Sequence, residues 1–173
     1  MNNSDIYRKA LALDPLTEGE ALQIYRSAPL AELMLAADAL RREQAGDPQV
    51  VTWQIDRNVN ITNVCISGCK FCNFHCKPHQ SDKAYITTIE EYDAKIRETL
   101  ALGGDQLLLQ GGLHPKLDIV FYEELFRELK RRFPQLRLHA LGAPEVAHIA
   151  RISRLDPETV LLRLIAAGLD SLP

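Results

Sequence analysis

Two segments near the start of the chain have apolar residues at helical spacing. Thr17 and Glu20 form a capping-box pair that opens the first segment. The second runs from about residue 30 to residue 44 and places Leu33, Ala36, Ala37 and Leu40 on one face. Gly46-Asp47-Pro48 ends it. The pattern predicts an N-terminal extension of two helices over residues 1–48.

From residue 49 onward, short apolar runs alternate with longer segments of helical periodicity. Extended structure is expected at residues 50–55, 59–61, 106–110, 136–141 and 169–172, and helices at 88–103, 119–133, 145–152 and 157–167. This alternation predicts an α/β fold with a parallel sheet and right-handed crossovers. Because Pro173 falls where a strand-to-helix loop is expected to follow, we interpret residues 49–173 as the first half of a (β/α) TIM-type barrel domain truncated at its C-terminus.

Composition narrows the possible partners. The 173 residues are 46% hydrophobic and 25% charged, with a net charge of −3, which offers no basic footprint for nucleic acid. No apolar run approaches the roughly 20 residues needed to cross a bilayer, so no membrane partner is expected. The N-terminus lacks the pattern of a signal peptide, and the four cysteines are expected to be reduced thiols or metal ligands. These observations predict a cytoplasmic protein.

The spacing of three cysteines is the sharpest chemical signal. Cys65, Cys69 and Cys72 lie within eight residues of a loop that follows a predicted strand, and three thiolates can bind three corners of a [4Fe–4S] cluster. The fourth iron is then open to the amino and carboxylate groups of S-adenosylmethionine (SAM). Cys76 leaves two alternatives: a closed zinc site with four cysteine ligands, or a fully ligated cluster of an electron carrier.

Further candidate residues follow the second and third predicted strands. Gln110 precedes the pair Gly111-Gly112, where missing Cβ atoms let backbone groups approach a ligand, so this segment is a candidate for binding the SAM amino group. His139 and Glu145 are expected at the same mouth of the barrel and are the candidate catalytic residues.

The cysteine loop resembles that of the radical SAM superfamily. More narrowly, the chain resembles the dehypoxanthine futalosine cyclase family over residues 56–65, 69–74, 110–115 and 167–173. The resemblance implies a (β/α) barrel whose cluster is held by Cys65, Cys69 and Cys72. It also implies that Phe71 and Phe74 lie near bound SAM and that Gly111-Gly112 is the family's glycine pair.

The same resemblance implies a reaction. The parent enzyme is expected to cleave SAM reductively and to cyclise dehypoxanthine futalosine on the futalosine route to menaquinone, with flavodoxin or ferredoxin as the electron donor. Aminofutalosine synthase is the alternative within the superfamily. The segment 75–83, which includes Cys76, is longer and more basic than the family pattern predicts.

Overall fold

The chain folds into two compact units, which are described separately. The computed structural model describes residues 2–46, 49–80 and 82–173. The two units are Met1–Trp53 and Gln54–Pro173. The pair Asp47-Pro48, at which the helical extension was expected to end, lies outside the described residues.

Among its described residues, the first unit contains three helices, which corrects the expected number of two. They are α1 (Asn3–Leu11), α2 (Glu18–Ser27) and α3 (Leu30–Gln44). Helix α1 was not predicted; it buries one apolar side chain, Ile6. Its start is marked by a capping box between Asn2 and Asp5.

Glu20 ties α2 to the helix before it. Its carboxylate closes the predicted capping box by accepting a hydrogen bond from the Thr17 amide at 2.7 Å. It also accepts one from Lys9 Nζ on α1 at 2.7 Å. A cap and an ion pair therefore share one largely buried carboxylate.

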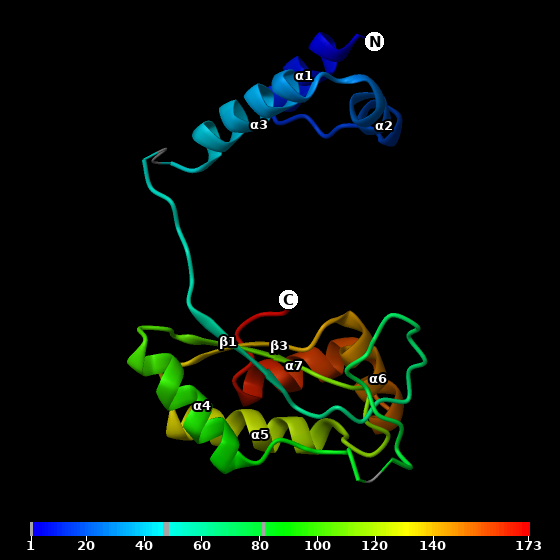
Figure 1. The fold of residues 1–173 in the computed structure, drawn as a ribbon, viewed down its shortest axis with the longest axis vertical. Helices are drawn as coiled ribbons and strands as arrows, with labels where there is room; N and C mark the ends of the chain where they lie inside the picture. Colours follow the sequence, from blue (N-terminus) through cyan, green and yellow to red (C-terminus); the bar gives the residue numbers. More distant parts are fainter. Residues whose placement is uncertain (1, 47–48, 81) are drawn as a thin grey trace. The chain divides into compact units, whose positions relative to one another are not determined.

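The second unit contains a three-stranded parallel sheet in the order β1-β2-β3 (Figure 1). The strands are β1 (Asp56–Asn60), β2 (Gln106–Gln110) and β3 (Arg137–Ala140). The helices are α4 (Ile89–Ala101), α5 (Ile119–Arg132), α6 (Ala143–Ser153) and α7 (Pro157–Ala167). The predicted alternation is thus confirmed, but β1 begins at Asp56, because residues 50–55, though expected to be extended, pair with no neighbouring strand.

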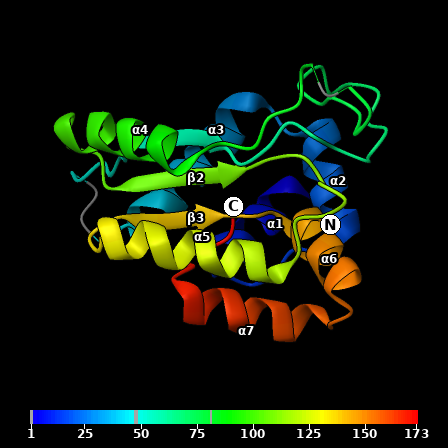
Figure 2. The same cartoon turned by 90° about the horizontal axis from the view of Figure 1, so that it is seen from below.

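One face of the sheet is apolar and carries the core. Side chains of β1, β2 and β3, among them Val59, Leu107 and Leu138, pack in one cluster with residues from all four helices of the unit. The strands and the helices that cover this face are seen in Figure 2. The opposite face is polar and partly exposed: Asn58 and His139 flank Leu108 in register across it. This is the face that a closed barrel turns toward its interior.

The fourth predicted strand begins as a single parallel bridge between His139 and Ser171. Asp170 fixes it, because its carboxylate accepts hydrogen bonds from the Leu138 amide and from Lys130 Nζ, both at 2.7 Å. The sheet therefore extends in chain order as a β/α barrel requires. Among the described residues, no helix is long and apolar enough to cross a membrane.

Candidate functional site

The cysteine loop leaves the carboxyl end of β1 and is fastened at both of its ends. Thr62 Oγ1 donates to the Tyr85 carbonyl at 2.6 Å, and Asn63 exchanges hydrogen bonds with the Lys83 carbonyl and the Tyr85 amide at 2.8 and 2.9 Å. Both of these polar side chains are buried. Sequence reasoning missed them, although two buried polar residues directly after a strand form a recognisable signal. They hold the loop where ligands bind in β/α folds.

The four cysteines fall into two groups. Cys65 and Cys76 are buried and lie side by side: the Cys65 amide donates to the Cys76 carbonyl at 3.0 Å. Cys69 is exposed, with its Sγ atom 3.0 Å from Ser67 Oγ, and Cys72 is half-buried. Cys76 is therefore part of the paired base of the loop, whereas Cys69 and Cys72 lie on its outer part.

The cysteine thiols of the loop are suitable ligands for an iron–sulfur cluster, although the structure does not hold them together in a preformed cage. Within the described ranges, no three His, Cys, Asp or Glu side chains are close enough together to hold a metal ion. The Cys65 sulfur already accepts a hydrogen bond from the Leu113 amide at 3.2 Å, an interaction that suits a thiolate or cluster ligand. Cys69 and Cys72 lie outside regular secondary structure and can approach Cys65 without breaking a helix or a strand.

The glycine pair packs against the start of the cysteine loop. A Cβ atom at Gly112 would lie 2.2 Å from the Val64 carbonyl oxygen and 2.9 Å from Cys65 Cβ. At Gly111 it would lie 3.0 Å from the Thr62 carbonyl oxygen. Close packing between β2 and the loop is thus one reason for these glycines, in addition to the SAM contact predicted for them.

Glu145 stands at the same edge of the sheet. Leu141, with a left-handed φ of 63°, turns the chain out of β3 and into α6, whose first turn carries Glu145. Burial raises the pKa of this carboxyl, while backbone amides of Glu145, Gly111 and Gly142 oppose the rise. The structure therefore brings Glu145 to the glycine pair, where a carboxyl of raised pKa suits proton or ligand binding.

Replacing Glu145→Gln is expected to stabilise the chain in a pH-dependent way. A carboxyl whose pKa is raised by folding destabilises the folded state once it ionises. Below the ordinary glutamate pKa of about 4.3, the variant and the unchanged chain should have the same free energy of unfolding. The advantage of the variant should grow as the pH rises toward the pKa of Glu145 in the folded chain, and then level off. Urea unfolding across this pH range measures it. Glu158→Gln, at an exposed first-turn position of α7, is the matched control, and a pH-independent gain at Glu145 would contradict the assignment.

Of the other predicted residues, Gln110 directly precedes Gly111 and so lies beside this group. His139 faces the polar side of the sheet, with Nδ1 2.7 Å from Ser171 Oγ, and Gln110 ends β2. Phe71 is 91% exposed, whereas Phe74 packs edge-to-face on Tyr85 at 6.4 Å between ring centroids. Their roles at a SAM site stay predictions.

A parallel β/α sheet with a cysteine-rich loop at the carboxyl end of its first strand defines a β/α-barrel type of enzyme domain. The chain belongs to the radical SAM superfamily, whose family model matches residues 59–173. Members of this superfamily use a [4Fe–4S] cluster and SAM, and the cysteine loop lies inside the matched region.

The chain is similar to curated proteins along nearly its whole length. It is 46% identical to cyclic dehypoxanthine futalosine synthase of Streptomyces coelicolor, covering 96% of this chain and 42% of that protein. It is 36% identical to the synthase of the same name from Halalkalibacterium halodurans, covering 100% and 46%. It is 38% identical to 5-amino-6-(D-ribitylamino)uracil–L-tyrosine 4-hydroxyphenyl transferase of Methanothermobacter thermautotrophicus, covering 97% and 45%. The chain thus spans less than half the length of these relatives.

Solved structures agree on the fold. Methylornithine synthase superposes with a TM-score of 0.69 at 19% identity, covering 96% of this chain and 46% of that one. HydG, a maturase of the [FeFe]-hydrogenase, superposes with a TM-score of 0.66 at 16% identity, covering 98% and 45%. At such identities the likeness concerns the fold alone. It confirms the predicted partial β/α barrel.

Proposed function

We propose that this chain is the cluster-binding half of a radical SAM enzyme that cyclises dehypoxanthine futalosine on the route to menaquinone. The observation that carries the proposal is the 46% identity to a cyclic dehypoxanthine futalosine synthase, which extends over 96% of this chain. When bound, the cluster supplies the electron that cleaves SAM to methionine and the radical that abstracts hydrogen from the substrate. A flavodoxin or ferredoxin is the proposed donor of that electron, and the cytoplasm, where thiols stay reduced, is the proposed location.

Residues of the cysteine loop and of the segments beside it would bind the cluster, bind SAM and position the loop. Cys65, Cys69 and Cys72 would hold three irons, and the fourth would bind the amino acid end of SAM. Glu145 lies by the glycine pair, where a carboxylate can accept the SAM ammonium group. The hydrogen bonds of the buried Thr62 and Asn63 side chains would hold the loop at the mouth of the barrel.

A second radical SAM activity remains a candidate because the transferases are nearly as similar to this chain. The relative from Methanothermobacter thermautotrophicus is 38% identical over 170 residues, against 36% over 173 for the synthase from Halalkalibacterium halodurans. The aminofutalosine synthase expected as an alternative belongs to the same class of candidates. Substrate assays would distinguish these activities. Detection of SAM cleavage would exclude a zinc-binding module or a simple electron carrier.

The 173-residue chain alone is expected not to cyclise dehypoxanthine futalosine. Its polar sheet face carries an exposed Asn58 and a half-buried His139, whereas radical chemistry needs a chamber closed to water. A chain extended by the remainder of a barrel should convert the substrate under anaerobic, reducing conditions, as followed by chromatography. Turnover by the 173 residues alone would show that they form a complete enzyme. Conversion of a tyrosine and ribitylaminouracil substrate by the extended chain would instead favour the transferase.

A further inference from the structure

A buried histidine that the proposed function does not use lies beside the cysteine loop. His148, on α6, is only 6% exposed. Its Nε2 atom lies 2.8 Å from the His114 carbonyl oxygen, and its Nδ1 atom lies 3.1 Å from Nη2 of Arg151. Because a guanidinium group can only donate, Nδ1 is the acceptor, and Nε2 therefore carries the proton and donates to His114. The ring is a neutral imidazole with both nitrogens in use.

The carbonyl that His148 binds belongs to the segment that contacts Cys65. In this segment, residues 112–114, the Gly112 amide donates to the Thr62 carbonyl at 2.8 Å, and the Leu113 carbonyl accepts from the Ile66 amide at 3.1 Å. The Leu113 amide then points at Cys65 Sγ, 3.2 Å away. His148 on α6 adds a further hydrogen bond to this segment, at the carbonyl of His114, which directly follows Leu113.

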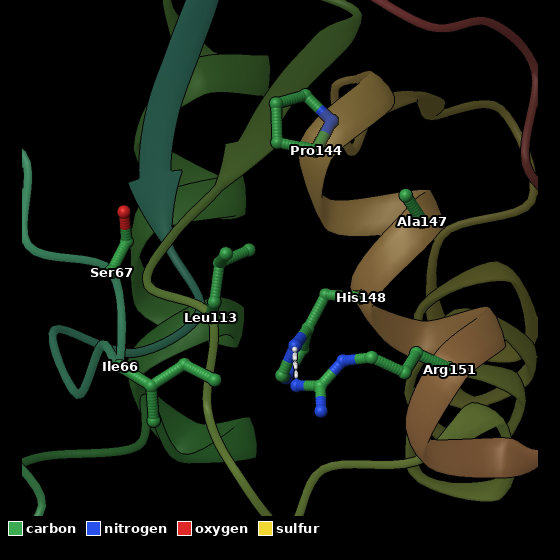
Figure 3. A pocket seen from close by; sticks show the side chains of 7 residues that line it. All are labelled: Ile66, Ser67, Leu113, Pro144, Ala147, His148 and Arg151. Carbon is green, nitrogen blue, oxygen red and sulfur yellow. Dashed lines mark hydrogen bonds between the residues drawn. The ribbon is translucent and has the colours of Figure 1, made fainter.

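A pocket of about 390 Å³ separates α6 from the cysteine loop. Figure 3 shows Ile66, Ser67 and Leu113 on one side of it, with the α6 residues, among them His148 and Arg151, on the other. Across this pocket, the hydrogen bond from His148 Nε2 to the His114 carbonyl joins α6 to the segment 112–114.

We propose that His148 is a positioning residue that sets the reduction potential of the cluster through the Leu113 amide. By holding the His114 carbonyl, it keeps the Leu113 N–H directed at the Cys65 sulfur. A hydrogen bond to a cluster sulfur stabilises the more negative, reduced state and so raises the potential. The inference rests on the proposed function, in which Cys65 is a cluster ligand.

The test compares His148→Leu with His148→Gln in the anaerobically reconstituted chain, by redox titration followed with electron paramagnetic resonance. Leucine removes both hydrogen bonds. The reduced-to-oxidised ratio at a fixed potential should therefore fall about tenfold, which equals 59 mV for a one-electron couple. Glutamine can donate to His114 and accept from Arg151, and should restore the ratio to within about twofold. Ala147→Ser, on the same helix and the same pocket wall, is the matched control and should leave the potential unchanged.

A cluster of normal iron content whose potential is the same in His148→Leu and in the unchanged chain would overturn this proposal alone. A chain that binds no iron would overturn the cysteine assignment, and this proposal with it. If His148→Leu does not fold, Leu113 is replaced by its α-hydroxy acid, which removes the one N–H and keeps every side chain. The same lowered potential is then expected, and an unchanged potential would overturn the proposal.

Discussion

Cys65→Ala, Cys69→Ala and Cys72→Ala should each abolish cluster binding, whereas Cys76→Ala should keep it. Three thiolates suffice for a cluster with one open iron, and losing any of them leaves two. Cys76 acts through its backbone: its amide donates to the Asn63 carbonyl at 2.9 Å, and its carbonyl accepts from the Cys65 amide. Alanine preserves both of these hydrogen bonds. Cys76 is also buried at the base of the loop, apart from the exposed Cys69.

Iron and sulfide analysis after anaerobic reconstitution measures this outcome. The unchanged chain and Cys76→Ala should both contain about four irons, the content of a cubane cluster. Because Cys76→Ala removes a thiol from the same loop, it controls for general damage by the substitutions. Stoichiometric zinc in protein purified without oxygen, or loss of iron from Cys76→Ala, would instead support a site with four cysteine ligands.

Gly112→Ala should destabilise the second unit strongly. The added Cβ would lie 2.2 Å from the Val64 carbonyl oxygen and 2.7 Å from its carbon, and both are backbone atoms that no side-chain rotation moves. Val64 is itself held by its bridge to Cys76. The backbone segments at Gly112 and Val64 must therefore move apart, and we expect a loss of about 3 kcal/mol in the free energy of unfolding, at the upper end for overpacking. The Leu113 amide would be displaced from Cys65 as well.

The matched control is Gly68→Ala in the cysteine loop. A Cβ atom there meets nothing within 4 Å, and Gly68 does not have a left-handed φ. Urea unfolding should therefore place this variant within about 0.5 kcal/mol of the unchanged chain. Equal stability of Gly112→Ala and Gly68→Ala would contradict the close packing between β2 and the loop. If Gly112→Ala is stable yet fails to bind SAM, the glycine serves the ligand instead.

Local signals in the sequence were sufficient to predict most helices and strands. Helix α7 has the predicted bounds because Asp156 caps it, Pro157 opens it and Gly168 ends it with a left-handed φ of 117°. The apolar run of β2 was likewise predicted to the residue. Helix α1 was missed because its capping box pairs Asn2 with Asp5, which differs from the Ser/Thr and Glu/Gln pattern that marks a helix start.

For the candidate site, the sequence predicted some of the residues, and the structure was needed to show how they meet. The spacing of Cys65, Cys69 and Cys72 is a property of the sequence alone, and with it the membership of the radical SAM superfamily was predicted. The sequence also named Glu145 as a candidate. That its carboxyl is stabilised by the Gly111 amide became visible only once β2 and α6 were placed side by side.

The order of helices and strands follows from local signals in the sequence, and so does the chemistry predicted for the cysteine loop, because capping, periodicity and ligand spacing act within a few residues. Tertiary structure alone decided which residues support that loop. The Leu113 amide meets Cys65 across 48 positions, and His148 meets the His114 carbonyl across 34. Such contacts depend on the register of the parallel strands and on how α6 packs beside them. Neither leaves a local pattern, since in each contact one of the two groups is a backbone atom, which does not depend on the side chain.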